Sequence, residues 1–342
     1  MVEVSTVGLD LAKRVFHVHG EDGSGAKIFS RPLTRSQLEP FFQKLERCVV
    51  AMEACSSAYH WARRLQAMGH RVALIPPIYV KPFVVRNKND ARDAEGICRA
   101  AQRPGIRTVP VKTEAQQASG ALHRVRDLLV RQRTQAANQI RGLAAEFGLI
   151  APLGPAGFKG LLEAIDASAL PAPAGLALAA QARHWATINT EIKALEATIV
   201  AEARACPATL RLMGVPGVGP LTAHALVANL PDMTIFRSGR DLAAWLGLTR
   251  KDRSTGGRAI TSGSISKRGN KTLRRLLVLG ATARLSHERR KKAPDPWLAG
   301  LLAKKAFRVV AVAQAAKTAR IVWALLIRGE AYQPNHRPRL AA

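Results

Sequence analysis

The sequence predicts an α/β domain followed by a helical coiled-coil region and a mostly α-helical C-terminal domain. Residues 4–76 contain short valine-rich runs in which apolar residues alternate, and this period of two is typical of strands. Residues 113–205 contain apolar residues at helical spacing in two long segments. Beyond residue 207, glycine-rich turns separate further helical patterns. A chain of 342 residues can hold two or three separate cores, and we place the boundaries after residues 112, 206 and 330.

The first predicted strand contains an acidic residue. Residues 4–10 are mostly apolar and lead into Asp10, and the alternation continues through 15–19 and, after turn residues at 21–25, through 26–29. This pattern predicts a three-strand meander. A carboxylate in such a strand is costly to bury without a partner, and a metal ion is one such partner.

A second carboxylate ends the next predicted strand. Residues 48–52 form a short valine-rich run that leads into Glu53. Ser56 is a candidate N-cap for a helix over 58–68, and residues 71–76 are predicted to form a further strand. The sequence therefore offers two carboxylates, those of Asp10 and Glu53, in or at the end of strands.

Two aspartates lie three residues apart in the sequence NKNDARDAE, residues 87–95. Positions i and i+3 share one face of a helix, so Asp90 and Asp93 can present their carboxylates together at the start of a helix. With Asp10 and Glu53 they would bind two divalent ions about 4 Å apart. Mg²⁺ prefers such oxygen ligands, and Mn²⁺ is a possible substitute. The alternative is a solvated helix start, where the helix dipole favours acidic residues.

Positive charge is concentrated near the C-terminus of this chain, whose net charge is +28. Residues 250–342 contain 22 of the 52 Lys and Arg but 4 of the 24 Asp and Glu, which predicts contact with nucleic-acid phosphates rather than an ordinary solvated surface. Residues 331–342 are expected to form a basic, disordered tail.

The sequence predicts a cytoplasmic protein without a membrane partner. We find no apolar run of the ~18 residues that a spanning helix needs, and no signal peptide precedes Val2. The four cysteines show no CxxC spacing and fit reduced thiols, so neither disulfides nor zinc are expected.

Two long amphipathic segments are predicted to pair as an antiparallel coiled coil. Thr113 and Gln116 form a capping box at the start of a helix that runs to about residue 147. After a Pro/Ala/Gly linker at 169–175, a second helix is predicted over 176–205. Such helices pack within one chain or join two copies in a homodimer or homotetramer, and both alternatives remain open.

Glycines mark a turn within residues 212–230. Gly217 and Gly219 allow positive φ and let backbone N–H groups approach a phosphate at the N-terminus of the helix that follows. This pattern is similar to a DNA-binding helix-hairpin-helix, and the alternative is an ordinary Gly/Pro turn. A second amphipathic helix is predicted over 236–248.

Residues 249–283 join a loop rich in Gly, Ser and Thr to a basic helix with Leu273, Leu276, Leu277 and Ala281 facing inward. The serines either form turns or supply a hydroxyl that attacks a phosphodiester while cations hold the phosphate oxygens. The candidate nucleic-acid-binding side chains of the basic run are Lys267, Arg268, Asn270, Lys271, Arg274 and Arg275.

These motifs resemble those of IS110-family transposases, in particular the IS1111 group. VGLDLAK around Asp10, MEA around Glu53 and KNDARDAE around Asp90 and Asp93 resemble the family's DEDD, RuvC-like domain of RNase H-like fold. VPGVGP, STGG and ISKRGNKTLRRLL resemble its C-terminal Transposase_20 domain. The resemblance covers about residues 4–326.

The resemblance implies a DNA recombination enzyme that uses Mg²⁺ and a serine nucleophile. The nucleophile carries over onto Ser254, and Ser262 is the nearest competitor because the loop is about one residue longer than the family pattern. The implied partners are donor and target DNA and a guide non-coding RNA, at the bacterial nucleoid, with an active site composed from two subunits. Two other functions remain open: a metal-only junction nuclease of the RuvC type, and a non-catalytic nucleic-acid-binding protein.

Overall fold

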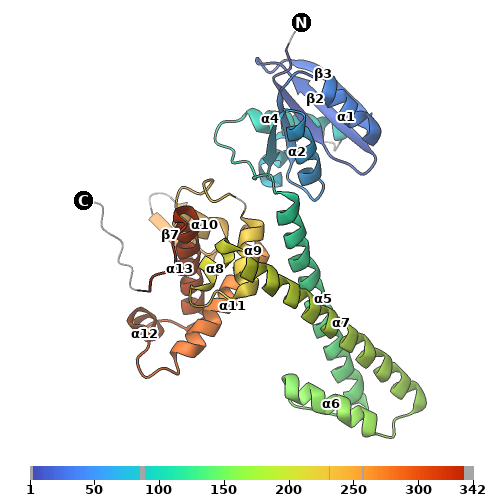
Figure 1. The fold of residues 1–342 in the computed structure, drawn as a ribbon, viewed down its shortest axis with the longest axis vertical. Coiled ribbons are helices and arrows are strands. Elements are labelled where there is room, and N and C mark those ends of the chain that lie inside the picture. Colours follow the sequence, from blue (N-terminus) through green and yellow to red (C-terminus); the bar gives the residue numbers. More distant parts are fainter. Residues whose placement is uncertain (1–2, 85–88, 231, 256–257, 335–342) are drawn as a thin grey trace. The chain divides into compact units, whose positions relative to one another are not determined.

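The computed structural model describes residues 3–84, 89–230, 232–255 and 258–334 (Figure 1). The chain divides into two compact units, Met1–Glu114 and Ala115–Ala342. The first unit is mixed α/β and the second is mostly helical. The predicted basic tail lies mainly outside the described residues, because the description ends at residue 334.

A five-stranded mixed sheet forms the centre of the first unit. Its strands are β1 (Thr6–Asp10), β2 (Val15–Glu21), β3 (Lys27–Thr34), β4 (Val49–Glu53) and β5 (Arg71–Ile75). They lie in the order β3-β2-β1-β4-β5, with antiparallel pairing among β1, β2 and β3 and parallel pairing of β1 with β4 and β4 with β5. The predicted meander is therefore confirmed, although β3 continues to Thr34 instead of ending at Phe29.

Helices cover both faces of this sheet. They are α1 (Arg35–Lys44), α2 (Ala58–Ala67), α3 (Pro77–Val80) and α4 (Asp90–Gln102), with a 3₁₀ turn, η1, at Lys81–Phe83. Successive side chains of a strand point to opposite faces. Val50 and Met52 share a core with residues of α1 and α2, whereas Ala51 between them shares a core with Ile97 of α4. The first unit is thus a layer of helices on each side of one sheet.

Helix α1 was not predicted, although its sequence contains the signals. Thr34 and Gln37 form a capping box at its start, and Leu38 and Phe42 are buried four positions apart. Pro40 lies inside the helix and interrupts the pattern that identifies helices in a sequence.

One other local prediction in this unit was wrong. The N-cap position of α2 is occupied by Ser57 rather than Ser56, and its side chain makes no capping hydrogen bond. Between α4 and α5, Val109 forms an isolated antiparallel bridge with Leu74 of β5.

The second unit contains most of the helices and one β-hairpin. The helices are α5 (Glu114–Glu146), α6 (Pro155–Ala167), α7 (Ala172–Ala205), α8 (Pro207–Met213), α9 (Pro220–Asn229), α10 (Gly239–Trp245), α11 (Lys271–Glu288), α12 (Pro296–Leu302) and α13 (Phe307–Arg328), and the strands are β6 (Arg250–Thr255) and β7 (Arg258–Ile265). Three predictions need correction. Most of the expected linker at 169–175 belongs to α7, the helix expected over 236–248 is confined to α10, and the Gly-rich loop is largely a β-hairpin.

Helices α5 and α7 pack antiparallel within the chain (Figure 1). Their polar contacts are Ser119 with Glu202, Arg126 with Glu196 and Arg133 with Asn189. The contacts on α5 recur every seven residues, which is the heptad spacing of a coiled coil. Of the two predicted arrangements, the structure therefore contains the pairing within one chain.

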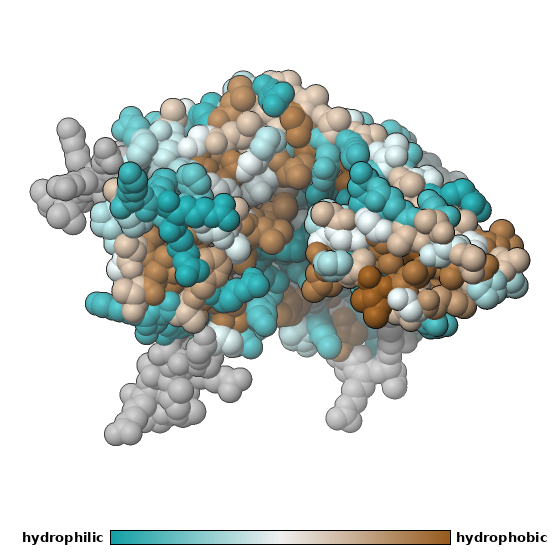
Figure 2. Space-filling model, turned by 90° about the horizontal axis from the view of Figure 1, so that it is seen from below, coloured by the Kyte–Doolittle hydropathy of each residue, from teal (hydrophilic) through white to brown (hydrophobic). Residues whose placement is uncertain are grey.

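The α6 end of this helical hairpin exposes apolar side chains (Figure 2). Ile150, Leu153 and Leu176 are 84%, 91% and 71% exposed. Leu128 of α5 is also exposed. The hairpin thus buries only part of its apolar surface within one chain.

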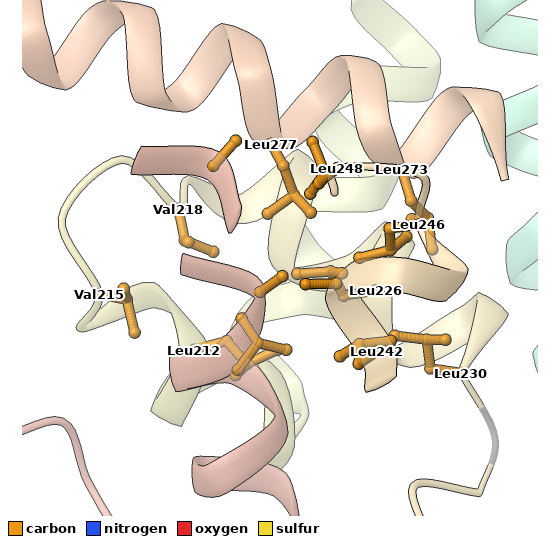
Figure 3. Close-up of a cluster of buried hydrophobic side chains, with 14 of the residues drawn as sticks. Leu212, Val215, Val218, Leu226, Leu230, Leu242, Leu246, Leu248, Leu273 and Leu277 are labelled. Carbon is orange, nitrogen blue, oxygen red and sulfur yellow. The ribbon is translucent and has the colours of Figure 1, made fainter. Parts of the chain in front are cut away.

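The core of the second unit lies between α8, α9, α10, α11 and α13 (Figure 3). Leu273, Leu277 and Ala281 of α11 are buried in it, as the sequence predicts. The glycine turn between α8 and α9 contacts α11 directly, because a Cβ on Gly280 would lie 1.9 Å from the carbonyl oxygen of Gly217. Gly217 itself has φ +90°, a conformation that favours glycine.

Helix α13 corrects the expectation that no apolar run is long enough to span a membrane. By length and composition it would be, with a mean hydropathy of 1.5 over its most apolar window. In this structure α13 packs against α10 and α11, and Val310, Ala315 and Val322 are fully buried. Apolar residues of α13 therefore form part of the core of the second unit.

A hydrogen-bonded chain of two buried histidines and an exposed glutamate joins α5, α7 and α9. His123 Nε2 lies 2.8 Å from His224 Nδ1, and His224 Nε2 lies 2.8 Å from the Glu202 carboxylate. When neutral His224 donates to the carboxylate, its Nδ1 accepts a hydrogen bond from the Nε2–H of neutral His123. Burial, and then the neighbouring His224, lower the pKa of His123 to about 4.

The stability of the second unit is expected to fall as the pH drops from 6.5 towards 4. His123 in the unfolded chain takes up a proton near pH 6.5, whereas folded His123 does so only near pH 4. Between these values the unfolded state binds more protons, so the free energy of unfolding decreases as the pH falls, by at most about 3 kcal/mol. Urea denaturation across this range should show a smaller decrease for His123→Asn than for the wild type, because the other titrating groups are common to both. If the free energy of unfolding decreased equally with falling pH in both proteins, the low pKa would not belong to His123.

Candidate metal centre

Helix α4 crosses β1 at Gly8. A Cβ at this position would lie 2.0 Å from the carbonyl oxygen of Ala94 and 2.7 Å from the backbone nitrogen of Cys98, so the close approach requires glycine. Residues two apart in a strand point to the same face. Asp10 therefore faces the side of the sheet that α4 covers.

Gly8→Ala is expected to destabilise the first unit by about 1–3 kcal/mol, since the methyl group forces α4 away from β1. Urea denaturation measures this effect. Gly23→Ala is the matched control, because a Cβ at Gly23 meets nothing within 4 Å. If both variants were equally stable, α4 would not be held as closely against β1 as described.

Three carboxylates meet where β1 ends and α4 begins. The Asn89 side chain accepts a hydrogen bond of 2.9 Å from the backbone N–H of Ala91 and caps α4, so the helix starts at Asp90 as predicted. Asp90 and Asp93 both lie in the first turn. One carboxylate oxygen from each of these residues and one from Asp10 lie within 4.8 Å of one another.

Glu53 lies at the wall of the same site. It ends β4, the parallel neighbour of β1, and Leu9 pairs with Met52 in the register of these strands. Glu53, Asp10 and Asp93 line one pocket of about 610 Å³. Among the described residues, the carboxylate oxygens of the three aspartates lie close together, and Glu53 lines the pocket next to them without belonging to this group.

The charges of this site repel one another. Burial, and then the negative charges of Asp93, Asp90 and Glu53, together raise the pKa of Asp10 to about 6. A hydrogen bond from the backbone N–H of Leu11 acts in the opposite direction. Oxygen donors held together in this way favour a hard divalent cation, which would supply the missing positive charge.

Two residues near the carboxylates had no role in the sequence-based prediction. His17 on β2 pairs with Asp10 across the sheet, and its Nε2 lies 3.0 Å from Ser30 Oγ. Burial lowers the pKa of His17, and the charge of Asp90 partly opposes this shift. Lys81 contributes a cationic side chain to the pocket. A tight connection between β1 and β2 would have placed His17 opposite Asp10, so the sequence could have indicated His17 as a neighbour of the site. Nothing in the sequence indicates Lys81.

The candidate nucleophile lies in the β-hairpin of the second unit. Ser254 is in β6 and pairs with Ala259 of β7, and Ser262 lies further along β7. Residues 256 and 257 of the STGG motif, and the side chains of both serines, lie outside the described part of the chain. The choice between Ser254 and Ser262 therefore stays a prediction.

Three of the predicted nucleic-acid-binding side chains have partners within the chain. Asn270 caps α11 by accepting a hydrogen bond from the backbone N–H of Leu273. Arg274 donates to the carbonyl oxygens of Leu246 (3.0 Å) and Arg268 (2.7 Å). Arg275 forms an ion pair with Asp127. The basic run is thus not a uniformly solvated face, because these contacts also fix the start of α11.

Lys267, Arg268 and Lys271 of the same run are exposed. Gly219, at the N-cap position of α9, is also exposed. These groups lie on the surface of the second unit, where phosphate oxygens can reach them.

Two family models match the chain. Residues 210–295 match the model described as "Transposase IS116/IS110/IS902 family", and residues 7–147 match the DEDD model of IS110-type proteins, described as "Transposase". The second match contains the four acidic residues of the candidate metal centre, and the first contains the glycine turn, the β-hairpin and α11.

Similar proteins cover nearly the whole chain. A Pseudomonas aeruginosa protein named "Probable family 20 transposase" is 48% identical over 98% of this chain and 100% of its own length. The "Transposase for insertion sequence element IS1328" of Yersinia enterocolitica is 39% identical over 97% of this chain and 99% of its own length. The "Transposase for insertion sequence element IS1111A" of Coxiella burnetii is 38% identical over 97% and 92%.

An α/β unit with an acidic centre, followed by a basic helical unit and with matches of this extent, defines the class as a DNA-processing enzyme. More particularly, the chain belongs to the IS116/IS110/IS902 family of insertion-sequence transposases. The resemblance seen in the sequence motifs is thereby confirmed at the level of the family.

Proposed function

We propose that this transposase cleaves and exchanges DNA strands at a Mg²⁺ centre formed by Asp10, Asp90 and Asp93, with Glu53 as a further ligand. The single observation that carries the proposal is the meeting of the three aspartates within 4.8 Å. The raised pKa of Asp10 supports it, since the negative charges of Asp93, Asp90 and Glu53 act on this carboxyl group and a cation would neutralise them. Mn²⁺ fits the same oxygen ligands.

We assign the first unit to the RNase H-like, RuvC-like fold. The mixed sheet supports the assignment, because an antiparallel meander is continued by two parallel strands. The acidic residues at the adjacent ends of β1 and β4, and the helix α4 that covers them, give additional support.

In the proposed reaction, Ser254 supplies the nucleophile. Its oxygen loses its proton and forms a bond to the phosphorus of the scissile phosphate, while the bond from phosphorus to the strand oxygen breaks; the leaving oxygen takes up a proton and becomes a strand hydroxyl, and a phosphoserine link remains. Asp10, Asp90, Asp93 and Glu53 would hold a divalent ion, which would supply charge stabilisation at the phosphate and lower the pKa of the attacking hydroxyl. Lys81 at the pocket wall can approach a phosphate oxygen.

The second unit is proposed to hold the nucleic acids. Gly217 and Gly219 would form a helix-hairpin-helix contact with DNA phosphates through backbone N–H groups. Lys267, Arg268 and Lys271 would contact phosphates, with the N-terminal turn of α11 fixed by its own contacts. A guide RNA is proposed as an additional partner, and a basic surface fits either polymer.

The active site is proposed to combine residues from two copies of the chain. The carboxylates and the serine belong to different compact units, which permits an exchange of units between copies. The exposed apolar end of the helical hairpin supports assembly into a dimer or tetramer, because such a patch is commonly covered by a partner.

Divalent ions are expected to stabilise the wild type but not Asp10→Asn. Binding to the folded state alone raises the free energy of unfolding by about 2.7 kcal/mol at 100 times the Kd. Thermal unfolding with increasing Mg²⁺ or Mn²⁺ measures this as a rise in Tm. The matched control is Glu95→Gln, which removes a carboxylate of α4 that pairs with Arg99. A Tm rise that survived in Asp10→Asn would place the ion elsewhere.

A further inference from the structure

Trp297 is an exposed aromatic residue held in a fixed position on α12. Its ring is 38% exposed, while the next residue, Leu298, is fully buried and anchors the helix. The Asp295 side chain caps the helix by accepting hydrogen bonds from the backbone N–H groups of Trp297 (2.9 Å) and Leu298 (3.3 Å). Asp295 is itself held by an ion pair of 2.9 Å with Arg284. The start of α12 is therefore held by its capping hydrogen bonds and by an ion pair within the chain.

Lys317 of α13 lies against this ring. Its Nζ is 4.0 Å from the centroid of the Trp297 ring, a cation–π contact. Arg320 follows three residues later on α13 and is exposed. A planar apolar surface and positive charges thus lie together at one place.

The surrounding segment has almost no free negative charge. Residues 284–320 contain ten Lys and Arg and two acidic residues. Both acids are engaged within the chain, Asp295 with Arg284 and Glu288 with Lys291 and the backbone N–H of Asp295. The exposed cations of this segment other than Arg320 are Arg289, Arg290, Lys291, Lys292, Lys304, Lys305 and Arg308.

We propose that Trp297, Lys317 and Arg320 form a binding site for single-stranded DNA, in which an unpaired base stacks on Trp297 and the cations hold the adjoining phosphates. The inference rests on the proposed function, because strand cleavage and exchange separate the strands of a duplex. The face of a paired base is covered by its neighbours in the stack, so only an unpaired base offers it to an aromatic side chain. The site is separate from the basic run at the start of α11.

A binding assay with short oligonucleotides tests the site. A fluorescent oligothymidine strand of about 20 nucleotides and a duplex of equal length are titrated with the full-length protein in a chelator, so that cleavage does not occur. Trp297→Ala should weaken binding of the strand by about 10-fold or more and binding of the duplex much less, because base stacking on an aromatic residue is worth about 1–3 kcal/mol. Trp297→Phe retains an aromatic face and should recover most of the loss.

The salt dependence separates stacking from charge. Lys317→Ala should reduce the slope of log affinity against log salt by about 0.7 for the single strand, whereas Trp297→Ala should leave the slope unchanged. Lys193→Ala, which removes an exposed charge on α7, is the matched control and should behave as the wild type.

Each outcome bears on a different claim. Equal affinity of Trp297→Ala and wild type for the single strand, with normal binding of both probes, would overturn this inference alone. A wild type that bound neither probe would overturn the proposed function as well. If Trp297→Ala weakened the binding of an oligouridine strand but not that of the oligothymidine strand, the site would bind RNA and the assignment to DNA would be overturned.

Discussion

Strand cleavage of donor DNA is expected to fall by about 10³-fold or more in Asp10→Asn and in Asp90→Asn. Each change removes one oxygen ligand and its charge while leaving the volume of the side chain nearly unchanged. A loss of several kcal/mol of charge stabilisation in the transition state corresponds to a rate decrease of this order. Cleavage of labelled donor DNA in Mg²⁺, with the guide RNA present, measures it.

The folded state of these variants is expected to remain intact. Asp10 is surrounded by like charges, so replacing it with neutral Asn relieves repulsion in the absence of metal. Circular dichroism and DNA binding should therefore match the wild type. Glu95→Gln, on the same helix but paired with Arg99, should keep full cleavage. Normal cleavage by both Asp variants would exclude the metal centre as the source of the cleavage activity.

The acidic centre was largely predictable because local patterns determine each of its parts. Period-two runs place Asp10 and Glu53 at strands, and the i, i+3 spacing places Asp90 and Asp93 on one helical face. What the sequence leaves undetermined is how closely α4 approaches β1. That approach depends on Gly8, and a glycine in a strand indicates close backbone contact without identifying the partner.

The second unit was less predictable because its important contacts join distant residues. Arg275 reads as a free cation in the basic run, yet its ion-pair partner Asp127 lies 148 positions earlier in the sequence. Arg274 similarly donates to the backbone of Leu246. The β6–β7 hairpin was taken for a loop, since its Gly, Ser and Thr are typical of turns and its strands lack a clear apolar alternation.

Ser254→Ala is expected to eliminate the covalent link between protein and DNA while preserving metal-dependent stabilisation and DNA binding. A serine hydroxyl is a weak nucleophile at neutral pH, so it needs a base or a metal to withdraw its proton. The acidic centre is the proposed source of that activation. Asp10→Asn should therefore eliminate the same link, although its serine is intact.

Mixing the two inactive variants tests whether the site is shared between copies of the chain. Mixed oligomers of Ser254→Ala and Asp10→Asn would contain some sites with an intact serine from one copy and an intact acidic centre from the other. Partial recovery of the link is expected in the mixture. Persistent inactivity of well-mixed oligomers would mean that both parts of the site come from one chain.

The most direct test of the serine mechanism is a denaturing gel of labelled donor DNA after reaction with Mg²⁺ and guide RNA. The wild type should give a slowly migrating protein–DNA adduct that survives denaturation, and Ser254→Ala and Asp10→Asn should give none. Loss of the adduct in Ser262→Ala, with retention in Ser254→Ala, would move the nucleophile to the second serine. Cleaved DNA without any adduct in the wild type would contradict the serine mechanism and identify a metal-only nuclease.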